Sequence, residues 1–240
     1  MAIRDALLHL ATRLGVFSKE PANFFCPLCE KGCRRFLPAG TPPRPIALCP
    51  NCQSLERHRL LWLTLSTLWN SGRLAGEGNL LHLAPEKCLQ PRLQQRFRYV
   101  SADWNSPLAF LRADITLLPF HGNAFDAIIC NHVLEHIAQD RLALSELRRV
   151  LKPSGWACIQ VPMDGDSTRE DPTVVDPAER LRLYGQTDHV RQYGRDFRER
   201  LEAAGFLVEV FPKSLFLGPD QLIRISVECE EEVWICGTAE

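Results

Sequence analysis

The chain has 240 residues, of which 45% are hydrophobic and 24% are charged. This composition is that of an ordinary globular protein and excludes disordered, collagen-like and fibrous classes. Its apolar runs fall well short of the roughly 20 residues that a membrane-spanning helix needs, so we expect no membrane span. The N-terminal residues lack the apolar core of a secretory signal, and we therefore expect a cytoplasmic protein.

Charge is unevenly distributed along the chain. Residues 1–75 carry ten Lys and Arg against four Asp and Glu, whereas residues 76–240 carry 18 against 25. A basic front segment suits an anionic partner such as RNA. A sequence pI of about 6.7 argues against a chain devoted to nucleic-acid binding.

The first residues predict a short helix, followed by a cysteine-rich module. Leucines recur at helical spacing within residues 1–21, which indicates an amphipathic helix. Residues 22–53 then hold two C-x2-C pairs separated by 19 residues, formed by Cys26, Cys29, Cys49 and Cys52. That spacing predicts a zinc-ribbon module in which four thiolates fill a tetrahedral, structural zinc site.

The module has few apolar residues, so metal binding is expected to supply its folding free energy. Cys33 lies between the two pairs, where it is either a free thiol or a replacement ligand. Residues 54–76 are expected to link the module to the rest of the chain. Within them, a helix over residues 54–71 has Ser54 as its expected N-cap and a broad apolar face.

From residue 79 onward, short apolar runs alternate with helical patterns. The runs predict strands at 79–84, 99–103, 125–131, 156–162, 206–211 and 232–238, and helical patterns cover 138–151 and 195–204. Such an alternation indicates repeated βαβ units and a parallel sheet. We therefore expect residues 77–240 to form one α/β domain.

Residues 114–156 carry a family resemblance in the stretch DITLLPFHGNAFDAIICNHVLEHIAQDRLALSELRRVLKPSGW. The stretch resembles the class I S-adenosylmethionine-dependent methyltransferases, in particular the type 11 group. The resemblance implies a Rossmann-like, doubly wound sheet of seven mostly parallel strands whose last strand is antiparallel. It also implies S-adenosylmethionine as the cofactor.

Acidic residues at the ends of successive strands fit this cofactor, because open parallel sheets bind ligands outside their carboxyl ends. Asp103 is expected to bind the ribose hydroxyls, and Asp114 with Ile115 to flank the adenine. Asn131 ends the strand at 125–131, which corresponds to the fourth strand of the family, and is expected directly above the methyl position. Ala84 and Glu86 are expected to shape the pocket, with the Glu86 carboxylate meeting the cofactor's ammonium group.

The turn after the first strand departs from the family pattern. Members of the family usually have glycines there, because glycine lets the backbone approach the ligand closely. Residues 83–87 read LAPEK and contain none. One alternative is therefore that the cofactor site has been lost and that the chain is a non-catalytic zinc-ribbon adaptor.

Two polar clusters are candidates for the chemistry. His132 and His136 follow the strand at 125–131, and His136 is the preferred general base because imidazole titrates near neutrality. Asp188 and His189 form the second cluster, with Arg191 nearby for an anionic group. This cluster belongs to an acidic segment, residues 163–194, that we expect to cover the substrate.

The leading hypothesis is a methyltransferase acting on a small molecule or a glycan. The alternative enzyme is an RNA methyltransferase that grips RNA through its basic front. The residues expected to do so are Arg34, Arg35, Arg44, Arg57, His58 and Arg59, with Phe24, Phe25 and Phe36 stacking on bases or packing the module.

Overall fold

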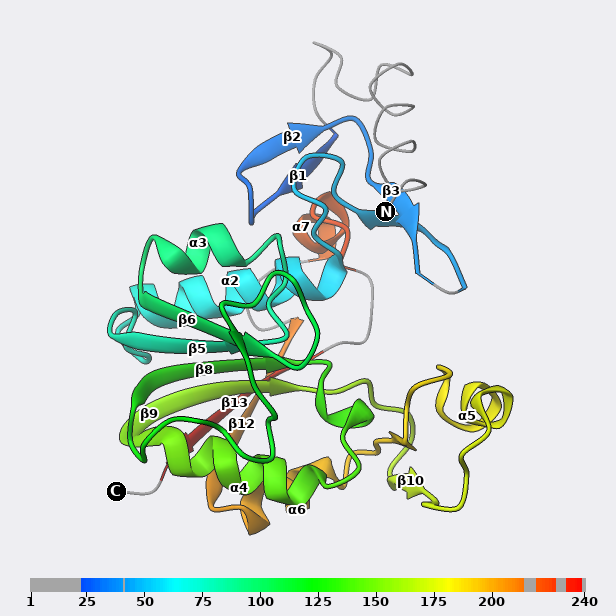
Figure 1. Ribbon diagram of the computed structural model, residues 1–240. Helices are drawn as coiled ribbons and strands as arrows, with labels where there is room; N and C mark the ends of the chain where they lie inside the picture. The colour runs from blue at the N-terminus through cyan, green and yellow to red at the C-terminus, as the bar shows by residue number, and fades with distance from the viewer. Residues whose placement is uncertain (1–22, 41, 214–218, 228–231, 239–240) are drawn as a thin grey trace. The chain divides into compact units, whose positions relative to one another are not determined.

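The computed structural model describes residues 23–40, 42–213, 219–227 and 232–238 (Figure 1). The helix expected within residues 1–21 lies outside this range. The chain divides into two compact units. The first contains the described residues up to Arg73 with Lys87–Arg92 and Phe211–Val233, and the second contains Leu74–Glu86, Leu93–Val210 and the chain from Trp234.

Two small antiparallel hairpins begin the first unit. One pairs β1 (Phe24–Cys26) with β2 (Lys31–Cys33), and the other pairs β3 (Leu37–Ala39) with β4 (Arg44–Leu48). The strands are too short for sequence periodicity to reveal. Each C-x2-C pair begins where a strand ends, which brings the four cysteines to one place.

Helix α2 (Glu56–Asn70) follows the second cysteine pair and confirms the predicted apolar face. The prediction of Ser54 as its N-cap is wrong: the N-cap is Leu55, whose N–H donates to His58 Nδ1 over 3.0 Å. The Ser54 hydroxyl instead lies 3.3 Å from the Cys26 sulfur and 3.2 Å from the Cys52 sulfur. The Ser54 hydroxyl therefore contacts the cysteine cluster and does not cap the helix.

Arg59 is the largest fully buried side chain in the described part of the protein. Its guanidinium lies 4.1 Å from the centre of the Phe36 ring. It also donates hydrogen bonds of 2.7–2.9 Å to the carbonyl oxygens of Ala47, Ser54, Ile225 and Ser226. Arg59 thus ties β4 and the start of α2 to the chain that follows helix α7 (Pro219–Arg224) within the same unit.

The second unit is built on a seven-stranded sheet with the order β12-β13-β9-β8-β5-β6-β7. The strands are β5 (Asn79–Leu83), β6 (Arg98–Asp103), β7 (Leu111–Arg112), β8 (Phe125–Asn131), β9 (Leu151–Gln160), β12 (Phe206–Pro212) and β13 (Glu232–Thr238). Strands β5 to β9 pair in parallel, and β13 pairs with β9 antiparallel. The predicted mostly parallel sheet with an antiparallel last strand is confirmed.

The core of the second unit lies against the middle of this sheet. Strand β8 is almost entirely buried, as expected of a central parallel strand. Helices α4 (Asp140–Val150) and α6 (Phe197–Ala203) cover one face (Figure 1). Their apolar residues, among them Leu144, Leu147 and Leu201, join the core cluster.

The remaining elements connect the strands of the sheet along the chain. They are α3 (Gln90–Gln94), the 3-10 helix η1 (Leu134–His136), β10 (Arg169–Glu170), α5 (Pro177–Tyr184) and β11 (Arg191–Gln192). Strand β9 begins directly after α4, five residues before the predicted start. A register shift in its pairing with β8 accommodates these extra residues. Within the described ranges, the helices are all too short or too polar to cross a membrane.

Candidate functional site

The carboxyl ends of β5, β6 and β8 border a cavity of about 630 Å³ in the second unit. A cavity of this volume suits a small-molecule ligand. The structure brings seven of the predicted cofactor and catalytic residues to its wall: Ala84, Asp103, Asp114, Ile115, His132, His136 and Asp188. Trp104, which was not predicted from the sequence, lines the same cavity and is 55% exposed. Its place directly after Asp103 at a strand end was the available signal.

The two strand-end carboxylates each use one oxygen to hold the local backbone. Asp103 Oδ1 accepts from the N–H groups of Asn105 and Ser106. Asp114 Oδ1 accepts from the Thr116 N–H over 2.8 Å and from its hydroxyl over 2.7 Å. These bonds lower the pKa of Asp114, so its carboxylate is ionised at neutral pH. Oδ2 of each carboxylate remains to accept from a ligand hydroxyl or amine.

Glu86 and Asn131 are not among the residues that line the cavity. Glu86 Oε2 lies 2.6 Å from His82 Nε2, and Glu86 Oε1 accepts from Asn131 Nδ2 over 3.3 Å. His82 Nδ1 in turn lies 2.9 Å from the Tyr99 hydroxyl. A polar chain thus runs from β6 through β5 to the end of β8, and the expected contact of Glu86 with the cofactor stays a prediction.

The glycine-free turn adopts a glycine-like backbone conformation. Ala84 has a φ of 46°, in the left-handed region that favours glycine. Its N–H donates to the Ala102 carbonyl oxygen over 3.1 Å, which fixes the turn against the end of β6. The backbone therefore follows the course expected of a glycine turn, at the expense of local strain.

Replacing Ala84 by glycine should raise the free energy of unfolding by about 0.5–1 kcal/mol. The left-handed conformation costs an L-residue about 1–2 kcal/mol, and the larger entropy of glycine in the unfolded chain offsets part of this gain. Urea unfolding measures the change. As a control, Ala143→Gly in the interior of α4 should lower stability. An equal loss of stability in both variants would show that the backbone at Ala84 is not strained.

The histidines after β8 are paired with acidic side chains. His132, at a φ of 54°, has its Nδ1 3.4 Å from Glu135 Oε1. His136 Nδ1 lies 3.3 Å from Asp188 Oδ2. His189 is buried, with Nδ1 3.0 Å from the Tyr184 carbonyl oxygen. Asp188 is therefore paired with His136, whereas the sequence suggested a pair with the adjacent His189.

Arg191 does not face a ligand. It is 4% exposed and donates to the carbonyl oxygens of Leu134, the first residue of η1, and of Ile137 and Ala138, which follow η1. It also donates to Glu170 over 2.7 Å. The prediction that Arg191 binds an anionic group of the substrate is wrong, because these contacts occupy its donors. Its role is to hold the turn that carries His136.

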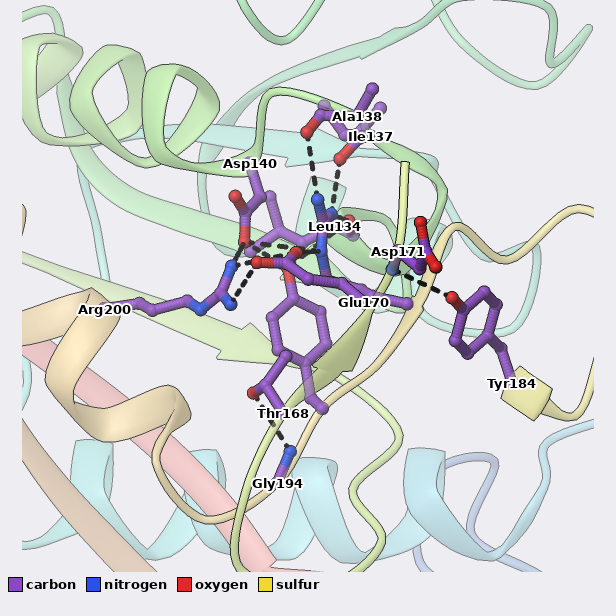
Figure 2. A network of polar contacts seen from close by, with 12 residues as sticks. Leu134, Ile137, Ala138, Asp140, Thr168, Glu170, Asp171, Tyr184, Gly194 and Arg200 are labelled. Atoms are coloured by element: carbon purple, nitrogen blue, oxygen red, sulfur yellow. Dashed lines mark hydrogen bonds and ion pairs between the residues drawn. The ribbon is translucent and has the colours of Figure 1, made fainter. Parts of the chain in front are cut away.

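Arg200 extends this network, as Figure 2 shows. Its two terminal nitrogens donate to Asp140 Oδ2 over 2.7 Å and to Glu170 Oε1 over 2.8 Å, and the Tyr193 hydroxyl donates to the same Asp140 oxygen. The guanidinium groups of Arg200 and Arg191 lower the pKa of Glu170 to about 2. This network joins β10, β11 and α6 to the start of α4.

Acid should weaken this network in a defined pH window. A lowered carboxyl pKa contributes stability above its unfolded value near 4.5, and that contribution is lost as the pH falls from there to about 2. Because the Glu170 side chain is 38% exposed, solvent screens its ion pairs. We therefore expect the ionised carboxylate to contribute about 1 kcal/mol to the free energy of unfolding. The free energy of unfolding in urea should fall less between pH 5.5 and pH 3 in Glu170→Gln than in the parent. Glu199→Gln serves as the exposed control and should match the parent.

The four paired cysteines form a second candidate site, in the first unit. Their sulfurs all lie within 4.8 Å of one another. Those of Cys26 and Cys52 are 3.6 Å apart, and those of Cys29 and Cys49 are 3.9 Å apart. A tetrahedral zinc with bonds of 2.3 Å requires sulfurs about 3.8 Å apart, so the donors fit that ion. Cys33 is outside the cluster, and burial raises its pKa to about 11.

The predicted RNA-binding surface is not supported, because several of its residues are used within the unit. Arg59 and His58 are buried, and Arg44 donates two hydrogen bonds of 2.9 Å and 3.0 Å to Glu56. The Phe36 ring is buried and packs edge-on against Phe24 at 5.5 Å. Phe24 and Phe36 therefore pack the module, which was the alternative to stacking on RNA bases.

Comparison with known proteins agrees with this architecture. Residues 78–159 match the family described as "Methyltransferase domain". A demethylmenaquinone methyltransferase of Clavibacter sepedonicus is 34% identical over 97 residues, which are 40% of this chain and 38% of that protein. An uncharacterized methyltransferase of Schizosaccharomyces pombe is 31% identical over 85 residues, or 34% of this chain and 31% of that protein. The chain thus spans less than two fifths of either relative.

A solved structure shows the same fold. An S-adenosylmethionine-dependent methyltransferase from Archaeoglobus fulgidus superposes with a TM-score of 0.51 at 13% identity, over 76% of this chain and 94% of that one. The family match covers β5 to β8 and nearly all of β9, and so includes β5, β6 and β8, the strands whose ends border the cavity. Residues 78–159 therefore match a methyltransferase domain within a sheet of the same fold as that structure, in agreement with the resemblance predicted from the sequence.

Proposed function

We propose that the protein is an S-adenosylmethionine-dependent methyltransferase that acts on a small-molecule acceptor. One observation carries the proposal: the strand-end carboxylates of Asp103 and Asp114 share a cavity with His132 and His136. Carboxylates suit the ribose hydroxyls and adenine amine of a nucleoside, and the histidines stand ready to take a proton from an acceptor. When bound, the cofactor supplies an activated methyl group.

The chain's own residues bind and align the reactants. Asp103 Oδ2 is placed to accept from the ribose hydroxyls, and Asp114 with Ile115 to border the adenine. Trp104 adds an aromatic wall beside Asp103. His132 and His136 are the candidates to accept the proton of the acceptor, with Asp188 orienting His136. In-line methyl transfer needs mainly this alignment.

A cavity of about 630 Å³ favours a small acceptor over a polymer. The relative from Clavibacter sepedonicus is named for a small-molecule substrate, which agrees with this choice. Within the described residues, no feature singles out a glycan or RNA as the acceptor.

Isothermal titration with S-adenosylmethionine and S-adenosylhomocysteine tests the cofactor site. We expect both to bind, and Asp103→Asn to weaken binding by about 10-fold or more, because it removes the charge from a charge-assisted hydrogen bond. Asp164→Asn, an exposed aspartate outside this cavity, should bind like the parent. Absence of binding by the folded parent would refute the proposal and favour the adaptor.

We also propose that Cys26, Cys29, Cys49 and Cys52 hold a structural zinc ion. Their tetrahedral spacing supports it, as does the Ser54 hydroxyl beside two of the sulfurs. Four thiolates leave no open position for a substrate. Thiols used in this way suit a reducing compartment, which supports a cytoplasmic location.

Metal analysis with a matched pair of variants tests the zinc site. Cys49→Ser should lose zinc and destabilise the first unit, because metal binding supplies folding free energy. Cys33→Ser changes a buried cysteine outside the cluster and should retain zinc. Full zinc content in Cys49→Ser would refute the assignment.

A further inference from the structure

A second group of metal-ligand side chains lies in the second unit, apart from the cysteines. Glu135, His136 and His189 each offer one ligand atom, and these atoms lie within 4.8 Å of one another. Glu135 and His136 belong to η1, and His189 precedes β11. Glu135 is 1% exposed and His189 is 3% exposed. The two residues are thus buried, while His136 reaches the wall of the cavity.

Two atoms of this group are buried without a partner. Among the described residues, neither Glu135 Oε2 nor His189 Nε2 has a hydrogen-bond partner. Buried polar atoms are nearly always satisfied in native proteins, so two such atoms in one cluster indicate a missing ligand. A carboxylate oxygen and an imidazole nitrogen are both suitable ligand atoms for a cation.

The other atoms of the same side chains are held as metal ligands usually are. His189 Nδ1 lies 3.0 Å from the Tyr184 carbonyl oxygen, so Nδ1 carries the proton and the lone pair is on Nε2. His136 Nδ1 lies 3.3 Å from Asp188 Oδ2, which leaves its Nε2 for a ligand. A metal-binding histidine typically donates its second nitrogen to a carbonyl or carboxylate in this way.

The backbone around the group is fixed before any ion binds. The Val190 N–H donates to the Glu135 carbonyl oxygen over 2.8 Å, which sets His189 beside Glu135. Arg191 donates to one carbonyl oxygen at the start of η1 and to two just after it. Ligands held on such a braced turn require little rearrangement on binding.

We propose that Glu135, His136 and His189 bind a divalent first-row transition-metal cation at the edge of the cavity. Two imidazoles and one carboxylate are a ligand set for such cations. Three protein ligands leave open positions for water or an acceptor oxygen, which is typical of catalytic sites. Metal binding is independent of the proposed methyl transfer, whereas the role of the metal rests on it.

In that role the cation activates an acceptor hydroxyl, because a bound cation lowers the pKa of the oxygen it holds. The hydroxyl proton passes to His132, and the oxygen lone pair forms the new bond to the methyl carbon. The electron pair of the broken carbon–sulfur bond stays on sulfur. His136, as a ligand, then leaves the role of proton acceptor to His132, whose ring also lines the cavity.

Titration with Mn²⁺, followed by electron paramagnetic resonance, tests the site. Mn²⁺ prefers oxygen and nitrogen donors to thiolates, so the cysteine cluster does not compete for it. We expect one tightly bound ion in the parent and affinity lower by about 10–100-fold or more in Glu135→Gln and in His189→Gln. His121→Gln replaces an exposed histidine and should bind like the parent.

A second measurement covers the case in which the variants do not fold. Spin-echo modulation of Mn²⁺ bound to the parent should show coupling to imidazole nitrogen. Absence of a bound ion, absence of that coupling, or equal affinity in the folded variants would overturn the site. Calorimetry with S-adenosylhomocysteine on the same sample separates the two proposals, since cofactor binding without Mn²⁺ binding refutes only the metal.

Discussion

Replacing Arg59 by methionine should lower the free energy of unfolding by about 4 kcal/mol or more. Methionine fills similar space, but it leaves four carbonyl groups without their donor, and each unsatisfied buried group costs about 1–3 kcal/mol. The contact of the guanidinium with the Phe36 ring is lost as well. Urea unfolding followed by tryptophan fluorescence reports the loss, since Trp62 and Trp69 lie on α2.

Arg35→Met is the matched control, because Arg35 is an exposed arginine of the same unit. It should change stability by no more than about 0.5 kcal/mol. Arg59→Lys keeps the charge but lacks the planar guanidinium that reaches four carbonyl groups. Its stability should therefore lie between those of Arg59→Met and Arg35→Met. Similar stabilities for Arg59→Met and Arg35→Met would show that the buried guanidinium contributes little.

Replacing Arg191 by methionine should cost about 3 kcal/mol of stability and disturb the side of the cavity that His136 lines. The change leaves three carbonyl groups in and just after η1 without their donor and removes a partner of Glu170, and the loss of a buried partner typically costs 3–5 kcal/mol. Since η1 carries His136, turnover should fall by more than cofactor affinity. Unfolding and calorimetry on the same variant separate these effects.

Arg182→Met provides the comparison, since Arg182 pairs with Glu179 on the exposed face of α5. Exposed ion pairs of this kind contribute little to stability, so this variant should resemble the parent in stability and in turnover. If Arg191→Met kept full turnover, the network at η1 would have no part in positioning His136.

The sequence could predict the sheet because its strands and helices have strong periodic patterns. Strand β8 is mostly apolar, and α4 repeats apolar residues at helical spacing, so each has one stable placement. The same regularity placed Asp103 at a strand end beside the cavity, whereas Asp114 was identified through the family resemblance. Two-residue elements such as β7 have no period to detect.

Side-chain partners were harder to predict because they depend on segments far apart in the chain. Ser54 has the residue type of an N-cap, yet its hydroxyl contacts Cys26, which is 28 positions away. Arg191 has the chemistry of an anion-binding residue, yet carbonyl groups more than 50 positions away occupy it. In both cases the local pattern was sound, and tertiary contacts decided the outcome.

The bonds between β11 and η1 also bear on how ligands enter and leave. Residues 190 and 191 make four hydrogen bonds to η1 and the residues that follow it, so the end of segment 163–194 nearest the histidines is fastened. A gate that opened there would have to break all four at once, which makes it slow. Exchange of product for fresh substrate should therefore proceed without moving this end, and the Val190 amide should be among the slowest in the segment to exchange its hydrogen with solvent.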